Sequence, residues 1–140
     1  MEINGKYIFN ITMFSLNNKI AIITGAGSGM GKATAKLFAK QGAQVHILDF
    51  DETSALEAVK EITAEGGNCS SVRVNVSNQQ EVKTVIDNIA SGSGRIDILF
   101  NNAGVGVPPI NLGVANDKHL AGAVYEMDVN YFGVIRLNNL

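Results

Sequence analysis

The apolar positions of the chain follow two alternating patterns from Ile20 onward. Short unbroken apolar runs, typical of buried parallel strands, alternate with longer stretches in which apolar residues recur at helical spacing. Strands are therefore expected over residues 20–24, 44–49, 71–75 and 96–100. Helices are expected from Met30 to a stop at Gly42, over 51–65, from Ser77 onward, and from 117 to about 137.

The helical segments also carry patterns that predict which faces are buried. In the first, the core face is expected at Met30, Ala33 and Leu37, and the solvated face at Lys32, Lys36 and Lys40. In the third, Ser77 followed by Gln80 predicts a capping box that opens an apolar stripe at Val82, Val85, Ile86 and Ile89. In the last, the apolar positions are Leu120, Val124, Met127 and Ile135.

The alternation of strands and helices predicts the topology of the sheet. Parallel crossovers are right-handed, and a doubly wound sheet orders its strands 3-2-1-4 before later strands are added. The expected fold class is therefore α/β, a Rossmann-like doubly wound parallel sheet truncated after the fourth strand and the long helix that follows it. An irregular loop is expected over residues 105–116, which include Pro108 and Pro109.

Composition and charge exclude several classes of protein. A chain of 140 residues is one domain at most, and its net charge of -2 lacks the clustered positive field needed by a nucleic-acid-binding protein. Cys69, the single cysteine, allows neither an internal disulfide nor a zinc site, and no metal is expected. The sequence shows neither an apolar run long enough for a membrane span nor a secretory signal pattern, so we expect a cytoplasmic protein with no membrane partner.

A glycine-rich turn, Thr24-Gly-Ala-Gly-Ser-Gly-Met-Gly31, follows the first expected strand. Glycines there let the backbone approach a pyrophosphate, and the helix start presents free N–H groups to the anion. A P-loop is excluded, because its first glycine and its Ser or Thr would fall on Ala26 and Ala33. The G-x-G-x-x-G spacing fails as well, and the spacing that fits is T-G-x-x-x-G-x-G, with Gly25, Gly29 and Gly31.

Three further landmarks follow in order. They are Asp49 at the tip of the second expected strand, Asn101-Asn-Ala-Gly104 after the fourth, and Asp128-Val-Asn130 with Gly133 in the last helix. With the glycine turn, they make the chain from about Leu16 to Leu140 resemble the classical, single-domain short-chain dehydrogenase/reductase family. The resemblance implies an NAD(P)-dependent oxidoreductase that transfers a hydride between nicotinamide and a small alcohol or carbonyl substrate.

The resemblance also implies the site residues. The expected cofactor-binding residues are Gly25, Ser28, Gly29, Met30, Gly31, Asp49, Phe50, Asn75, Val76, Asn102, Ala103 and Gly104, and the expected catalytic residue is Asn130. Asn75 stands where the family often has Asp. Asp49 lies 18 residues after Gly31, close to the ~20 typical of the ribose-binding acid, and NAD is expected to be preferred over NADP. Ser28 is uncharged, and no Arg or Lys occurs from residue 50 through 53 to neutralise the extra phosphate.

Plainer interpretations of the same residues stay open. The glycines could be turn formers only, Asp49 could be a solvated acid, Asn102 could end a strand, and Asn130 could cap or kink a helix.

The rest of the family's catalytic set is absent from these residues. The family pairs a Tyr and a Lys as Y-x-x-x-K with a substrate-holding Ser, but no Ser occurs after Ser93 and no Tyr has Lys four residues later. We therefore expect an extension over residues 1–15, with Met13 as a possible true start, and an incomplete NAD-binding domain over 16–140 that is inactive alone. The alternative is a noncatalytic nucleotide-binding or interaction module. By resemblance, the full-length protein is expected to be a homo-oligomer.

Overall fold

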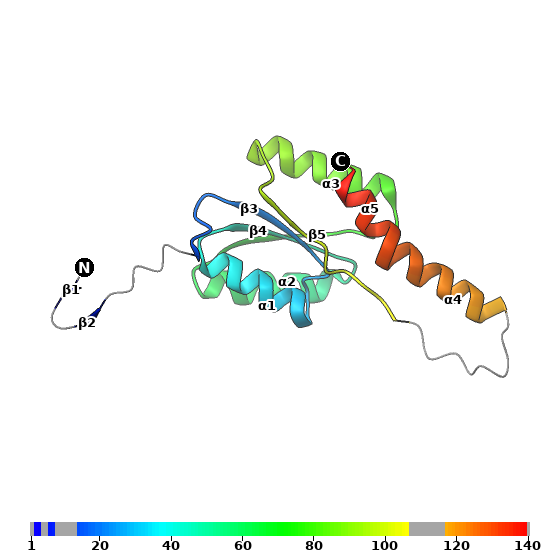
Figure 1. Ribbon diagram of the computed structural model, residues 1–140, viewed down its shortest axis with the longest axis horizontal. Helices are drawn as coiled ribbons and strands as arrows, with labels where there is room; N and C mark the ends of the chain where they lie inside the picture. Colours follow the sequence, from blue (N-terminus) through cyan, green and yellow to red (C-terminus); the bar gives the residue numbers. More distant parts are fainter. Residues whose placement is uncertain (1, 4–5, 8–13, 107–116, 140) are drawn as a thin grey trace.

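The computed structural model describes residues 2–3, 6–7, 14–106 and 117–139, and its centre is a parallel sheet of four strands (Figure 1). The order in the sheet is β5-β4-β3-β6, which confirms the predicted 3-2-1-4 order and leaves β6 at an edge. The strands are β3 (Ile20–Thr24), β4 (Gln44–Asp49), β5 (Asn68–Arg73) and β6 (Ile98–Phe100). A separate antiparallel pair is formed by β1 (Glu2–Ile3) and β2 (Lys6–Tyr7). Most of the expected N-terminal extension and of the loop over 105–116 lies outside the described residues.

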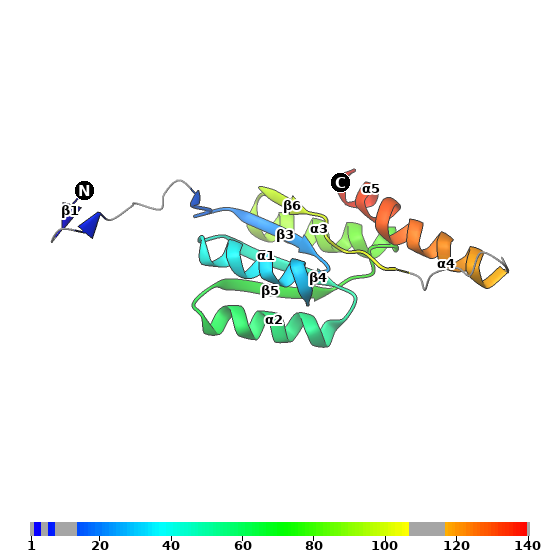
Figure 2. The same ribbon diagram turned by 60° about the horizontal axis from the view of Figure 1, so that its bottom comes forward.

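Helices cover both faces of the sheet (Figure 2). One face is covered by α1 (Gly29–Lys40) and α2 (Glu52–Ala64), and the other by α3 (Gln79–Ser93) and α5 (Gly133–Asn138). All five residues of β3 are buried, as expected for the central strand of a doubly wound sheet. The sheet therefore has one hydrophobic core on each face, and β3 contributes Ala21 and Ile23 to one core and Ile20 and Ile22 to the other.

The predicted core face of α1 is wrong. Met30 is 80% exposed and Leu37 is 55% exposed, whereas the buried residues are Gly31, Ala35 and Ala39. These small residues recur every four positions, so they form one stripe along the helix. A stripe of small side chains lets the helix backbone approach the sheet closely, and the pattern of large apolar residues conceals it.

The lysines of α1 do more than form a solvated face. Lys32 Nζ lies 2.7 Å from Glu61 Oε1, and Lys36 forms an ion pair with Glu65. Both pairs join α1 to the neighbouring helix α2 across the outer surface. The ion pair with Lys32 holds the pKa of Glu61 below its usual value.

Two strands differ in extent from the prediction. β5 was expected over 71–75, but it runs from Asn68 to Arg73, in register with β4 from Gln44 to Asp49. Backbone pairing with the six residues of β4 therefore sets the length of this edge strand, and its own apolar run does not. β6 begins at Ile98 because Asp97 turns back to β3: its carboxylate accepts a hydrogen bond from Ile20 N at 2.8 Å.

The capping box predicted for α3 is also displaced by one residue. The N-cap is Asn78, whose Oδ1 accepts hydrogen bonds from the backbone N–H groups of Gln80 and Glu81. Asn78 Nδ2 donates in turn to Glu81 Oε1 at 2.9 Å, so the side chains of Asn78 and Glu81 are also bonded to each other. The apolar stripe is as predicted, with Val82, Ile86 and Ile89 buried and Val85 packed against the core.

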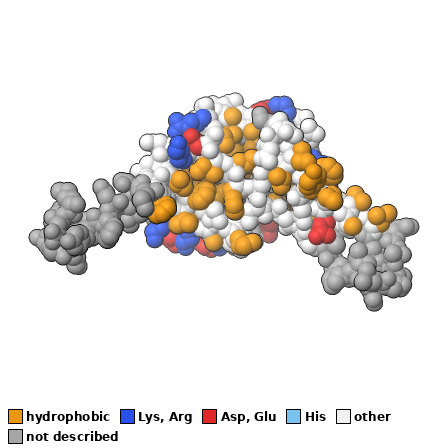
Figure 3. All heavy atoms as spheres, viewed as in Figure 1, with side chains coloured by type: hydrophobic (Ala, Val, Ile, Leu, Met, Phe, Trp, Pro, Cys, Tyr) orange, Lys and Arg blue, Asp and Glu red, His pale blue; other side chains and the backbone are white. Residues whose placement is uncertain are grey.

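The last helix is not one continuous α-helix. It comprises α4 (Asp117–Met127), a π-helical turn η2 (Asp128–Phe132) and α5. The expected apolar positions Leu120, Val124, Met127 and Ile135 are exposed, and the buried residues are Val129, Gly133 and Leu137. α4 extends beyond the sheet (Figure 1), which explains the exposure of its residues Leu120, Val124 and Met127, whereas Ile135 lies on α5, whose buried residues are Gly133 and Leu137. Figure 3 shows apolar side chains gathered toward the α4 end. None of the described helices is long and apolar enough to cross a membrane.

Candidate functional site

The glycine turn between β3 and α1 is shaped by close backbone approaches. Gly25 has a φ of +63°, and a Cβ there would lie 2.7 Å from Ala103 Cα. A Cβ on Gly31 would overlap the Gly25 carbonyl oxygen and lie 2.5 Å from Asn102 Nδ2. The first and last motif glycines therefore let the turn fold against itself and against the loop that follows β6.

Thr24 and Asn102 bind this turn to that loop. Thr24 is 1% exposed, and its Oγ1 accepts hydrogen bonds from Asn102 N at 3.1 Å and Ala103 N at 3.0 Å. Asn102 Nδ2 donates to the carbonyl oxygens of Thr24 at 3.1 Å and Gly25 at 2.9 Å. The side chain of Asn102 thus holds the turn in shape, and whether it also contacts a cofactor stays a prediction.

The N-terminus of α1 lies at the open side of the turn. Ser28 is the N-cap residue in an extended conformation, and its side chain makes no capping hydrogen bond. Ser28, Gly29 and Met30 are exposed, and Gly29 has a φ of +54° with open space where a Cβ would project. The first turn of α1 has no acidic residue, so its N–H groups and the positive end of the helix dipole are available to an anion.

Asp49 ends β4 beside the turn, and its carboxylate is held by two backbone groups. Its Oδ2 accepts a hydrogen bond from Gly27 N at 2.7 Å, and its Oδ1 accepts one from Asp51 N at 3.0 Å. A Cβ on Gly27 would lie 3.0 Å from Asp49 Oδ2 and 3.0 Å from Ala55 N. Gly27 is therefore a site residue that sequence reasoning missed, because the motif leaves its position unspecified.

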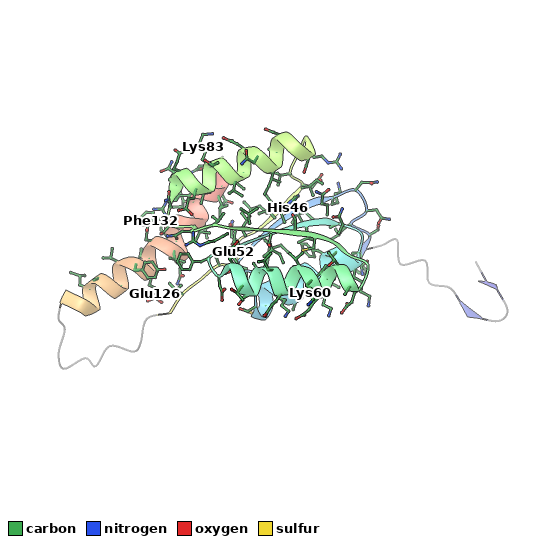
Figure 4. The ribbon with its side chains drawn as sticks, turned by 180° about the vertical axis from the view of Figure 1, so that it is seen from behind. His46, Glu52, Lys60, Lys83, Glu126 and Phe132 are labelled. Carbon is green, nitrogen blue, oxygen red and sulfur yellow. The ribbon has the colours of Figure 1, made fainter. Side chains whose placement is uncertain are left out.

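A cleft of about 140 Å³ opens at the carboxyl ends of the strands. The expected cofactor-binding residues that line it are Gly25, Asp49, Phe50, Asn75, Val76, Ala103 and Gly104. The lining residues that sequence reasoning missed are Leu48, Val74, Val105, Tyr125 and Val129. For Tyr125 and Val129 a signal existed, since they lie four residues apart and so share one face of the helix. Seen from behind (Figure 4), Glu52 of α2 and Glu126 and Phe132 of the last helix lie toward this end of the sheet.

Asn75 and Val76 follow β5 at the far side of the cleft from the glycine turn. The Oδ1 atom of Asn75 accepts hydrogen bonds from Ser77 N at 3.0 Å and from Ser77 Oγ at 2.8 Å. The backbone N–H of Asn75 donates to Glu81 Oε2 at 3.0 Å. The loop after β5 is thus fixed by the first turn of α3.

A cation lies at the rim of the cleft. The guanidinium carbon of Arg73 is 4.7 Å from the centre of the Phe50 ring, which is a cation–π distance. Arg73 is paired with Asp49 in the sheet register. Arg73 was not predicted, because it lies 24 positions after Asp49 in sequence and comes beside it only through the pairing of β4 with β5.

Asn130 lies in the π-helical turn η2 and holds the loop after β6. Its Oδ1 accepts a hydrogen bond from Val105 N at 2.8 Å, and its Nδ2 donates to Val105 O at 2.9 Å. Both hydrogen-bonding ends of the amide are therefore used by one backbone residue of the cleft lining. The catalytic role of Asn130 stays a prediction.

The structure thus separates the expected site residues into groups. The start of α1 is formed by Ser28, Gly29, Met30 and Gly31, and the cleft residues lie at the strand ends. Asn102 holds the glycine turn, and Asn130 holds the loop after β6. All lie at the carboxyl edge of a parallel sheet where its order reverses, which is the ligand-binding position of doubly wound folds. Among the described residues, no group of three metal-ligating side chains is present.

Comparison with known proteins agrees with this arrangement. The family model described as short chain dehydrogenase matches residues 19–140. The chain belongs to this family of oxidoreductases, and its fold is the family's Rossmann-like nucleotide-binding fold.

Individual relatives show how much of the chain is shared. The chain is 38% identical over 126 residues to the 7alpha-hydroxysteroid dehydrogenase of Escherichia coli strain K12, covering 89% of this chain and 48% of that protein. It is 47% identical over 93 residues to the uncharacterized oxidoreductase YxbG of Bacillus subtilis strain 168, covering 66% of this chain and 34% of that protein. A Burkholderia phymatum short chain dehydrogenase/reductase solved in complex with NAD superimposes with a TM-score of 0.79 at 34% identity, covering 89% of this chain and 43% of that one. The chain therefore spans between about a third and a half of the length of these relatives.

Proposed function

We propose that this chain is the cofactor-binding half of an NAD-dependent oxidoreductase that acts on a small alcohol or carbonyl substrate. The observation that carries the proposal is the pairing of Asp49 with the glycine turn. The Gly27–Asp49 hydrogen bond of 2.7 Å fixes a carboxylate next to the uncapped N-terminus of α1. A pyrophosphate fits the free N–H groups of the helix, and ribose hydroxyls fit the carboxylate.

Asp49 also supports a preference for NAD over NADP. Its carboxylate accepts hydrogen bonds from ribose hydroxyls but repels the additional phosphate of NADP, and like charges in contact cost several kcal/mol. Arg73, which is paired with Asp49 in the sheet and lies over the Phe50 ring, brings one positive charge to the same strand end. We therefore propose a preference that depends on the charge of Asp49.

Titration calorimetry of the 140-residue chain with NAD and NADP tests this proposal. Asp49→Asn keeps an oxygen to accept from Gly27 N but removes the charge, so it should narrow the ratio of the two dissociation constants. Asp87→Asn is the matched control, because Asp87 lies on α3 and pairs with Lys83. Tighter binding of NADP than NAD by the unaltered chain would contradict the proposed preference.

The bound nicotinamide would supply the hydride-transfer chemistry. The proposed role of Asn130 is to hold the part of the cleft lined by Val105 in shape. Asn130 acts on the Val105 backbone through the two hydrogen bonds given above. Because these 140 residues contain neither Y-x-x-x-K nor a Ser after Ser93, we propose that they bind the cofactor without turning over substrate. Oxidation of NADH by the purified chain, free of contaminating enzymes, would contradict this.

The alternative proposal is a noncatalytic nucleotide-binding or interaction module. Coding sequence beyond codon 140 distinguishes the two. A strand-like apolar run followed by Ser and then Y-x-x-x-K supports the enzyme, and a native stop codon with no such segment in any frame supports the module.

Two broader proposals concern the whole protein. We propose that the full-length protein is a homo-oligomer, which the exposed apolar residues of α4 support, and light scattering of that protein tests it. We also propose the cytoplasm as its compartment, since a lone Cys69 suits a reducing environment.

A further inference from the structure

The inference concerns the base end of the cleft and rests on the proposed function. With the pyrophosphate at α1 and the ribose at Asp49, the base continues in the direction of the sheet order, from the tip of β4 to the tip of β5. The cleft there is walled by Val74, 1% exposed, and Val76, 8% exposed. Asn75 lies between these two valines in sequence and also lines the cleft.

The orientation of the Asn75 amide is determined by its neighbours. Ser77 N is a backbone donor and cannot accept, so the atom 3.0 Å from it must be the amide oxygen. Ser77 Oγ, 2.8 Å from the same oxygen, occupies its second lone pair. Flipping the amide would place an NH₂ group against the N–H of Ser77 and leave that backbone donor without its acceptor.

The remaining hydrogen-bonding group is therefore the Asn75 NH₂. Within the described part of the chain it has no acceptor, so a bound base is its available partner. Asp in the same turn would hold Ser77 with one oxygen and present the other as an acceptor. Asn75 presents a donor in its place, which reverses the hydrogen-bonding character of this position.

The two common purine types respond oppositely to that reversal. The 6-amino group of adenine is a donor that suits a carboxylate, and only its ring nitrogens can accept from an amide. The 6-oxo group of hypoxanthine is an acceptor that suits an NH₂ group and is repelled by a carboxylate. We propose that Asn75 makes the base subsite tolerant of 6-oxopurines, so that nicotinamide hypoxanthine dinucleotide binds about as tightly as NAD.

Calorimetry of the 140-residue chain with NAD, nicotinamide hypoxanthine dinucleotide and ADP-ribose tests the proposal. For the unaltered chain, we expect the dissociation constants of the two dinucleotides to agree within about threefold, since one neutral hydrogen bond is exchanged for another. Asn75→Asp should raise the preference for NAD by at least about tenfold, because an acceptor is gained for adenine and a charged repulsion is gained against the 6-oxo group.

Asn88→Asp is the matched control. It makes the same chemical change at an exposed position of α3 that does not line the cleft, and it should keep the ratio of the unaltered chain. Circular dichroism checks that each variant is folded, and the unaltered chain alone decides the question if Asn75→Asp does not fold.

The outcomes separate the inference from the proposed function. A preference of the unaltered chain for NAD greater than about threefold, or an Asn75→Asp ratio equal to that of the unaltered chain, overturns the role of Asn75 while leaving dinucleotide binding in place. Absence of binding by NAD, the hypoxanthine dinucleotide and ADP-ribose alike overturns the proposed function and the inference together.

Discussion

Replacement of Gly31 by Ala tests whether close packing behind the glycine turn determines the stability of the fold. Gly31 is a buried residue of the first turn of α1, and a Cβ there would lie 2.5 Å from Asn102 Nδ2 and 2.9 Å from Ala26 Cα, besides overlapping Gly25 O. Ala is favoured over Gly in helices by at most about 1 kcal/mol. Overpacking costs about 1–3 kcal/mol, and the upper part of that range applies because backbone atoms cannot move aside. The expected net effect is a loss of about 1–2 kcal/mol in the free energy of unfolding.

Urea denaturation followed by far-UV circular dichroism measures this loss in a chain without tryptophan. The matched control is Gly92→Ala in α3, where no atom lies within 4 Å of the added Cβ. With only the helix preference acting, that variant should gain up to about 1 kcal/mol. The reasoning is refuted if Gly31→Ala is as stable as the unaltered chain while Gly92→Ala shows its gain.

Three other outcomes follow from single side chains. Thr24→Val should destabilise the chain by about 2 kcal/mol, because two backbone N–H groups lose their acceptor, whereas Thr34→Val, which removes a hydroxyl from the exposed side of α1, should be near neutral in the same urea assay. Burial raises the pKa of Cys69 to about 11, so the thiol of the folded chain should be alkylated slowly at pH 8, and equal alkylation rates with and without urea would contradict this. Because only the unfolded thiol ionises between about pH 9 and 11, the free energy of unfolding should fall as pH rises through that range. The hydrogen bond from Ile20 N, followed by that from Arg95, holds the pKa of Asp97 below its ordinary value of 3.8, so the ionised carboxylate stabilises the fold above that pH and this contribution is lost as pH falls through the lower folded pKa. Asp97→Asn should therefore flatten the acid side of a plot of unfolding free energy against pH.

Much of the fold follows from local sequence because the signals that specify it are local. The unbroken run at β3, the glycine stops and the apolar stripe of α3 each reflect burial along one element, and right-handed crossovers then fix the strand order. The core face of α1 could not be predicted in the same way. Ala35 and Ala39 are selected by how near the helix lies to the sheet, and a search for large apolar residues favours Met30 and Leu37.

The candidate site shows the same division. Residue types at the strand ends could be recognised from spacing, but the partner of each side chain could not. Asn102 bonds to the turn 78 positions earlier in sequence, and Asn130 bonds to a backbone 25 positions earlier. Such contacts exist only after the sheet is assembled, so no local pattern specifies them.

The hydrogen bonds between Thr24 and the loop after β6 also connect ligand binding to the order of folding. Contacts of such large sequence separation form late, because a long loop must close before they contribute. The glycine turn can therefore acquire its binding shape only after β6 has docked beside β3. A dinucleotide that binds only the fully folded turn stabilises the folded chain by RT ln(1 + [L]/Kd). Amide hydrogen exchange at β6, an edge strand of the described sheet whose residues do not line the cleft, should then slow on addition of the dinucleotide.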